Sequence, residues 1–508
     1  MAAIAPLSRA VRSKLTSRSD LATASYQLIN NLAEGTTSET AYDTAVVSAL
    51  RSSRDYRRPL FPATLLWLQR HQHNDGSWGG RIAVAHDRLV STLAVVVRLE
   101  AIPAAWAQQA LQRGLAYLWQ HASDWLSSSQ ETVAFELLVP RCLDEARSRG
   151  LQLPYTAFTR IIDLRDDKLR RMPMEALYNK PTTFVHSLEF LGPDLDRVQV
   201  TRLRSANGAY GNSPSATAYV LGMLDDPAAE SYLRRAMAVS LNGGACTVYP
   251  NEIFEKGWVL YNLGPDGIRL RGAQQHLDYL YQHSLTGATG ISREGLTADS
   301  DDTGMALALL NRSGRPLSLA GLCQFEREDC FSCFPYERNS SISANAHVLE
   351  AFVSSPYRHQ HTSAIQKIVA YLRDMRLDGC YWQDKWHISP LYATSQVVLA
   401  ARDVATDLVA PTIRWLLGSQ HSDGSWGCAG GTSEETAYAL QTLIVAEHLQ
   451  DSRMQSALEA GASYLSQHFD DMDYPELWIG KGLYTPYAVV RAAVIGALQQ
   501  YRAMIELP

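Results

Sequence analysis

The sequence has few cysteines and no long apolar run. Its 508 residues include seven cysteines, an odd number spread too thinly for a disulfide framework, which fits a reducing compartment. No apolar run approaches the roughly 20 residues that cross a bilayer. The first residues also lack the apolar segment of a secretory signal. These absences predict a soluble, cytoplasmic protein.

The sequence also lacks an excess of positive charge. Lys and Arg number 46 against 52 Asp and Glu, a net charge of −6. No basic stripe is present that could neutralise a series of phosphates, so nucleic acid is excluded as a partner. Proline and glycine are sparse, at 21 and 32 residues, whereas hydrophobic residues make up 46%. This composition excludes disordered and collagen-like chains and predicts a globular protein with a large core.

What the chain does contain is helical periodicity. Apolar residues recur three and four apart over segments of roughly 12 to 18 residues, separated by short Gly, Pro, Asn and Asp turns. Alternating patterns typical of strands are scarce. We therefore predict an all-α fold.

One turn repeats almost unchanged in the two halves of the chain. QHNDGSWG at 72–79 returns as QHSDGSWG at 420–427, and weaker copies lie near 207–219, 290–307 and 378–395. In each copy a glycine can end one helix and a Ser, Thr or acidic residue can cap the next. Such repeats are typical of a double ring of helices. We interpret Trp78 and Trp426 as structural.

Three carboxylates stand together where an apolar helix is predicted to begin. They are Asp299, Asp301 and Asp302, followed by the apolar run 305–310. If Asp301 points into an apolar cavity, desolvation and the neighbouring charges raise its pKa, which makes it a candidate general acid. The spacing alone also permits an ordinary acidic helix start or a divalent metal site.

Taken together, these motifs resemble class II terpene cyclases, in particular the two-domain bacterial and fungal diterpene cyclases of the copalyl diphosphate synthase type. The resemblance covers nearly the whole chain. The acid motif alone would be shared with squalene–hopene cyclases, but an ordered series of further motifs is more specific. These motifs lie at 41–45, 72–79, 86–94, 180–189, 299–303, 334–345, 384–387 and 477–481.

The resemblance implies two α-barrel (α/α toroid) domains, called β and γ, with the active-site cavity between them. The β domain would comprise residues 1–55 and 265–508 and hold the acid motif, and the γ domain would be the insertion 56–264. The third domain that ionises diphosphates in longer relatives is expected to be absent. The enzyme would then be an isomerase whose product keeps its diphosphate.

The resemblance also assigns roles at the cavity. Asp301 would protonate the terminal double bond of geranylgeranyl diphosphate, with Asp299 and Asp302 tuning it. Asn345 matches an asparagine that orients the acid in relatives. Two tryptophan candidates could stabilise the carbocations through their ring faces, with plain core packing as the alternative. They are Trp258 and Trp386.

At the cavity mouth, Lys180 matches a lysine that contacts diphosphate, and Mg²⁺ is expected to assist there. Glu131 is the candidate metal ligand, in an acidic motif that is sparser than in relatives. His186 matches a histidine that serves the final deprotonation in plant enzymes making ent-copalyl diphosphate. Thr247 replaces the asparagine partner of that histidine. The expected products are therefore copalyl, halimadienyl or kolavenyl (clerodane-type) diphosphate, consumed by a downstream terpene synthase or phosphatase.

Other readings stay open at the level of sequence. A drimenyl diphosphate synthase would use the shorter farnesyl diphosphate, and a triterpene cyclase would carry more of the Gln and Trp repeats. A non-catalytic α/α-toroid binding protein would share the repeats without needing the acid trio. A glycoside hydrolase on a similar toroid would need two separated carboxylates.

Overall fold

The computed structural model describes residues 15–52, 55, 57–171, 177–179, 182–335, 337–446 and 451–506. Over these residues the fold is helical apart from four two-residue strands in two antiparallel pairs. The prediction of an all-α fold is confirmed. Every helix of the described residues is too short or too polar to cross a bilayer.

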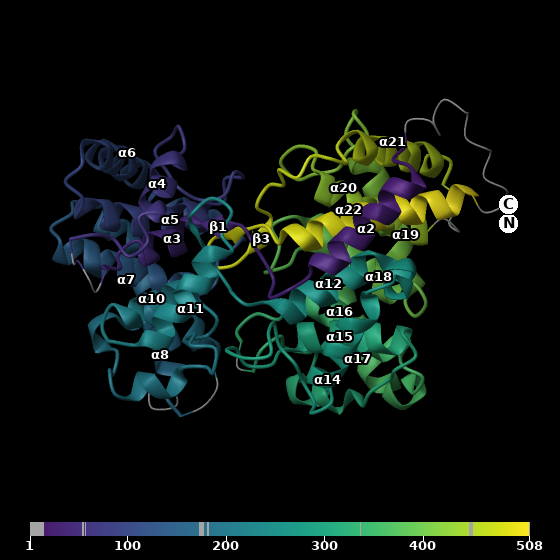
Figure 1. The fold of residues 1–508 in the computed structure, drawn as a ribbon. Coiled ribbons are helices and arrows are strands. Elements are labelled where there is room, and N and C mark those ends of the chain that lie inside the picture. Colours follow the sequence, from purple (N-terminus) through teal and green to yellow (C-terminus); the bar gives the residue numbers. More distant parts are fainter. Residues whose placement is uncertain are drawn as a thin grey trace.

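Two groups of helices lie side by side in Figure 1. The first group, on the left, contains α3 (Ala41–Val47), α4 (Ala63–Arg70), α5 (Ala85–Glu100), α6 (Ala105–His121), α7 (Phe135–Ser148), α8 (Thr159–Arg171), the 3-10 helix η3 (Thr183–Asp194), α10 (Pro214–Leu221) and α11 (Pro227–Ala238). The second contains α2 (Arg18–Asn31), α12 (Glu252–Asn262), α13 (Gly264–Arg269), α14 (Ala273–Ser284), α15 (Ser300–Arg312), α16 (Ile342–Ser354), α17 (Thr362–Asp374), α18 (Pro390–Ala401), α19 (Thr406–Ser419), α20 (Ser433–Val445), α21 (Met454–Gln467) and α22 (Tyr487–Glu506).

The repeated turn makes the same contacts in both groups. Trp78 is fully buried. Its backbone N–H donates to the hydroxyl of Thr92, and its Nε1 donates to the carbonyl of Leu68 at 2.8 Å. Trp426 is equally buried and donates to the carbonyl of Leu416 at 2.9 Å. Each indole is therefore bonded to the preceding helix, while the tryptophan backbone is bonded to a threonine of the following helix, which agrees with the structural interpretation.

Helix packing shows where the chain passes between the groups. Helix α3 packs on α5 and α10, whereas α12 packs on α15 and α22. Strand β1 (Glu39–Thr40) pairs with β2 (Ala245–Cys246), so the two crossings of the chain lie next to each other.

A C-terminal hairpin joins the two groups again. It is formed by β3 (Trp478–Ile479) and β4 (Leu483–Tyr484), and Lys481 at its turn is completely buried. The Lys481 ammonium lies 2.7 Å from a carboxylate oxygen of Glu189 and 2.6 Å from the Ser215 hydroxyl, both in the first group. A buried ammonium is tolerated because these partners compensate its lost hydration.

We expect Lys481→Met to lower the free energy of unfolding by about 3–5 kcal/mol, because it leaves the Glu189 charge buried without its partner. Urea unfolding followed by circular dichroism measures this. Adding Glu189→Gln to the variant should restore part of the loss. Arg234→Ala, which breaks the exposed pair with Glu230, should change stability by less than about 0.5 kcal/mol. Equal losses in the two single variants would contradict the expectation.

Candidate active site

The acid trio opens helix α15 and divides into two buried members and one that is partly exposed. Asp299 is the N-cap, and its Oδ1 accepts the backbone N–H of Asp302 at 2.7 Å. Asp299 and Asp302 are 3% and 6% exposed, whereas the Asp301 side chain is 14% exposed. The capping geometry therefore turns the outer two carboxyls into the protein and leaves the middle one available to a ligand.

The two buried members favour their protonated forms. Burial, followed by the charge of Asp301, raises the pKa of Asp299 to about 7. Burial, followed by the charge of Asp299, raises the pKa of Asp302 well above its usual value. The trio therefore avoids carrying three negative charges at neutral pH.

His347 on α16 is the direct partner of Asp301. Its Nδ1 lies 2.5 Å from Oδ1 of Asp301, and its Nε2 lies 3.1 Å from Oε1 of Gln396. Burial alone would lower the pKa of His347, but the Asp301 charge and the two hydrogen bonds outweigh it, so the pKa is raised. A protonated ring can donate to both neighbours. A cationic donor on one carboxyl oxygen strengthens the acid that holds its proton on the other.

A glycine allows this contact. A Cβ added at Gly304 would lie 2.9 Å from the backbone carbon of His347. The absence of a side chain therefore lets α15 approach the backbone of α16 at this point. The sequence gives little local sign of His347, because it lies in an apolar helical run and meets Asp301 only through this packing.

Asn345 lies two residues earlier on α16 and uses its amide on the backbone. Its Oδ1 accepts the N–H of Phe331 at 2.9 Å, and its Nδ2 donates to the carbonyls of Phe331 and Ser341 at 2.8 Å. The hydrogen bond to Asp301 comes from His347 instead. Asn345 holds the loop before α16 in place, and its proposed orienting role stays a prediction.

Aromatic rings extend from the acid into the second group of helices. Trp258 is 2% exposed, and its ring centroid lies 5.2 Å from that of His347. Its Nε1 donates to the hydroxyl of Tyr392 at 2.8 Å. Phe254 continues the series, 4.5 Å from Trp258 and 5.4 Å from Trp478 between centroids. We call Trp258, Phe254, Tyr392 and Trp478 the aromatic shell.

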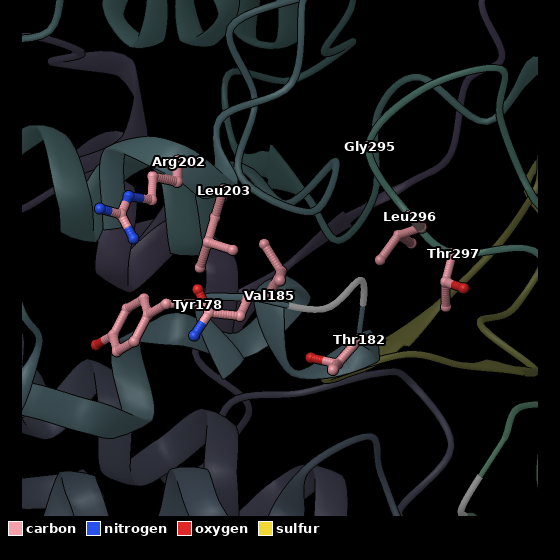
Figure 2. A pocket seen from close by; sticks show the side chains of 9 residues that line it. Tyr178, Thr182, Val185, Arg202, Leu203, Gly295, Leu296 and Thr297 are labelled. Atoms are coloured by element: carbon pink, nitrogen blue, oxygen red, sulfur yellow. The ribbon is translucent and has the colours of Figure 1, made fainter. Parts of the chain in front are cut away.

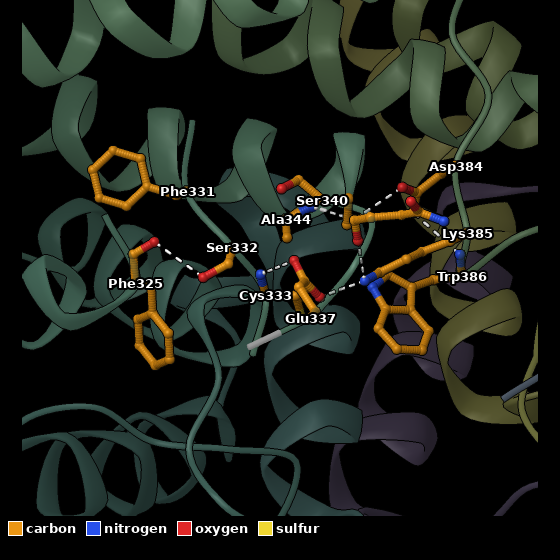
Figure 3. Close-up of polar contacts among 12 residues, drawn as sticks. Phe325, Phe331, Ser332, Cys333, Glu337, Ser340, Ala344, Asp384, Lys385 and Trp386 are labelled. Carbon is orange, nitrogen blue, oxygen red and sulfur yellow. Dashed lines mark hydrogen bonds and ion pairs between the residues drawn. The ribbon is translucent and has the colours of Figure 1, made fainter. Parts of the chain in front are cut away.

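Trp386 lies beside the loop that supports the acid motif (Figure 3), and its carbonyl accepts the N–H of Ile479, the residue after Trp478. Its ring is 6.2 Å from Phe334 and 4.9 Å from the ammonium of Lys385. Lys385 also pairs with Glu337, which accepts the N–H of Cys333 at 2.6 Å. The carbonyl of Cys333 in turn accepts the N–H of Ser300 at the start of α15. The chain thus places Trp258 and Trp386 in different surroundings.

A pocket of about 340 Å³ lies between η3 and the segment leading to the acid motif. Figure 2 shows Val185 and Leu203 on one side of it and Leu296 and Thr297 on the other, with Thr182 below between them. Further lining residues are Tyr178, Asn179, Arg202 and Gly295. The candidate Lys180 lies outside the described residues, so its side chain is not placed.

His186 and Thr247 lie near the buried hairpin. The Nδ1 of His186 is 2.8 Å from the carbonyl of Gly211, and burial, followed by Lys481, lowers its pKa to about 3. The ring is therefore neutral, with its Nδ1–H donated to that carbonyl. The hydroxyl of Thr247 accepts the backbone N–H of Lys481 at 3.4 Å.

The candidate metal ligand is already paired with a cation. Glu131 lies 2.6 Å from the guanidinium of Arg338, and burial, followed by Glu136, raises its pKa to about 6. Glu136 lies 2.6 Å from the ammonium of Lys168. No group of three or more His, Cys, Asp or Glu side chains is arranged to hold a metal ion in the part of the chain that the structure describes. These residues by themselves do not fit a Mg²⁺ site.

An acid trio at a helix start, opening beside an aromatic shell in a helical fold of two groups, defines a class II terpene cyclase. The squalene-hopene cyclase C-terminal domain family matches residues 338–471. A type B diterpene cyclase of Mycobacterium tuberculosis is 33% identical over 91% of this chain and 95% of its own length. An ent-copalyl diphosphate synthase of a Streptomyces species is 35% identical over 93% of this chain and 94% of its own.

A solved structure agrees with these relatives. The ent-copalyl diphosphate synthase from Streptomyces platensis is 30% identical, with a TM-score of 0.81 over 95% of this chain and 99% of its own. The chain belongs to the class II diterpene cyclases and is an enzyme of the copalyl diphosphate synthase type. The resemblance inferred from the motifs is confirmed.

We expect Gly304→Ala to reduce turnover at least about tenfold, because the added methyl group separates α15 from α16 and lengthens the Asp301–His347 contact. The overpacking should cost about 1–3 kcal/mol of stability. Product formation and urea unfolding measure the two effects. The matched control is Gly418→Ala in α19, where a Cβ would meet nothing within 4 Å. Full turnover in Gly304→Ala would show that the close approach is not needed.

The raised pKa of Asp299 predicts a pH dependence. Below about pH 7 its carboxyl is neutral, and above it an anion stands beside Asp301. That anion opposes proton loss from Asp301, so kcat/KM should fall as the pH rises through about 7. Asp299→Asn keeps a capping oxygen and should flatten this limb. Profiles of kcat/KM against pH for both proteins provide the check, and identical profiles would refute the assignment.

Proposed function

We propose that the enzyme converts geranylgeranyl diphosphate into a bicyclic diterpenyl diphosphate and leaves the diphosphate intact. The observation that supports this most directly is the Asp301 carboxyl, partly exposed at the edge of the aromatic shell and held by the buried His347. An acid placed in this way suits protonation of a hydrocarbon, because the reacting alkene has no polar group that could hold the acid by a hydrogen bond or a charge.

The first step transfers the proton of Asp301 to the terminal double bond. An alkene is a very weak base, so the transfer requires a stabilised conjugate base. His347 in its cationic form supplies that stabilisation at 2.5 Å. The proton forms a new C–H bond, and the alkene carbon that loses its π electrons becomes a tertiary cation.

Two ring closures follow, in which the π electrons of internal double bonds form C–C bonds and move the positive charge along the chain. The aromatic shell suits this stage, because ring faces attract a cation without adding to it. Trp258 is the shell member next to His347. Loss of a proton from the last cation gives the product alkene.

At the other end of the substrate, we propose that Lys180 contacts the diphosphate and that the nearby pocket belongs to this mouth. Pocket residues Thr182 and Thr297 offer hydroxyl groups there. Because Glu131 is paired with Arg338, we propose that any Mg²⁺ is held mainly by diphosphate oxygens, which it prefers as ligands.

We also propose the division into two α-barrel domains. The predicted insertion is 56–264, but the packing of α3 on α5 and of α12 on α15 favours edges before α3 and before α12 instead. All seven cysteines are unpaired, which supports a reducing, cytoplasmic location. A terpene synthase or a phosphatase would consume the diphosphate product.

The product skeleton is proposed among copalyl, halimadienyl and kolavenyl diphosphates. His186 donates to Gly211 and Thr247 binds the hairpin backbone, so the water-holding pair of the plant enzymes is not reproduced. Hydride and methyl shifts before proton loss distinguish the three skeletons.

Incubation with geranylgeranyl, farnesyl and squalene substrates, with and without Mg²⁺, tests the proposal. Products are dephosphorylated and identified by mass spectrometry. We expect a bicyclic diterpene alcohol from the first substrate, and a loss of at least about 10²-fold in Asp301→Asn. Circular dichroism confirms that the variant folds. Undiminished turnover by Asp301→Asn, or products from farnesyl diphosphate or squalene alone, would overturn the proposal.

A further inference from the structure

A second carboxylate occupies the same helix position as Asp301. Asp301 is the second residue after its N-cap, Asp299, and Glu434 is the second residue after Thr432, the N-cap of α20. The next residue in each case donates its backbone N–H to the cap side chain, at 2.7 Å from Asp302 and 3.1 Å from Glu435. Glu434 is thus the counterpart of the acid in another copy of the repeat.

Glu434 is fully buried and uses only one of its oxygens. Its Oε1 accepts from Nε1 of Trp478 at 2.8 Å, from the hydroxyl of Tyr438 at 3.1 Å and from Nε2 of His387 at 3.3 Å. Its Oε2 has no hydrogen-bond partner among the described residues. A buried carboxylate oxygen without a partner is costly unless a ligand uses it.

No lysine or arginine neutralises Glu434 among the ion pairs of the described residues. Among those ion pairs its basic partner is His387, whose Nδ1 accepts the backbone N–H of Ser389 at 3.1 Å. The same Nδ1 lies 3.3 Å from the carbonyl oxygen of Ser389, so both ring nitrogens have partners. Glu189 is a useful contrast, since its second oxygen is also unpartnered but Lys481 lies 2.7 Å from its first.

The aromatic shell connects Glu434 with Asp301. Trp478, a hydrogen-bond donor to Glu434, lies 4.8 Å from Tyr392 between ring centroids. The hydroxyl of Tyr392 accepts from Trp258, whose ring contacts His347, the partner of Asp301. The two carboxylates therefore stand at opposite ends of one continuous series of contacts through the aromatic shell.

We infer that Glu434 is the base that ends the reaction. This inference rests on the proposed function. In the last step a C–H bond next to the cationic carbon breaks, its electron pair forms the product double bond, and the proton goes to Oε2 of Glu434. Asp301 gave up one proton and Glu434 gains one, so the enzyme is reset when solvent returns a proton to Asp301 and removes one from Glu434.

Glu434→Gln tests the assignment, because the amide keeps an acceptor oxygen for the three donors but cannot take the proton. We expect the protein to fold and to protonate substrate, while the share of the parental alkene falls at least about tenfold. Isomeric alkenes or water-quenched alcohols should replace it. Product ratios after dephosphorylation are measured by gas chromatography and mass spectrometry.

Glu435→Gln is the matched control. Glu435 is also completely buried, but it accepts from the backbone of Cys428 at 2.8 Å and from Thr432 at 2.9 Å. It should lose stability without changing the product ratio. The same change of ratio in both variants would identify a packing effect and overturn the inference.

Glu434→Asp provides a second variant if the amide does not fold. It keeps the charge but withdraws the carboxylate by one methylene group, so the alkene isomer ratio should shift. An unchanged ratio in every Glu434 variant that folds overturns the inference while leaving cyclisation intact. Failure of the proposed function is recognised differently, since no cyclised diphosphate would then form even in the unaltered enzyme.

Discussion

The hydrogen bond between Asp301 and His347 is the interaction on which the rest of the site depends. A carboxylic acid must protonate a hydrocarbon, and it can do so only if its anion is stabilised at the moment it forms. His347 meets this need at 2.5 Å from Asp301. Because the ring is buried and its second nitrogen faces Gln396 of α18, its orientation is fixed by the protein and not by solvent.

The surrounding fold can be understood as support for that contact. Asp299 caps α15 and so fixes the direction of the Asp301 side chain, while Gly304 sets the distance between α15 and α16. The raised pKa values of Asp299 and Asp302 limit the negative charge beside the acid. The cap at Asp299, the close packing of α15 on α16 and the burial of Asp299 and Asp302 therefore all act on the carboxyl group of Asp301.

Much of the fold and part of the site could be predicted from the sequence, because they depend on local patterns. The turns at Trp78 and Trp426 and the helix start at Asp299 are local, and they fold as predicted. The role of His347 is not local, since an ordinary apolar helix would look the same. Asn345 and Trp386 show the converse difficulty: a motif match gives a position in the chain, but their contacts depend on loops that fold against distant segments.

The repeat explains how equivalent helix positions can hold an acid, Asp301, in one copy and a base, Glu434, in another. Helices α15 and α20 both begin at a capping residue and offer an equivalent position two residues later, and the surroundings of that position decide what a carboxyl there can do. Asp301 is partly exposed beside a basic ring that favours its anion after proton release. Glu434 is fully buried, bonds to Trp478, Tyr438 and His387 through one oxygen and keeps the other unused. The buried carboxylate of Glu434 is best compensated by the carbocation of the substrate. That carbocation forms only after Asp301 has transferred its proton.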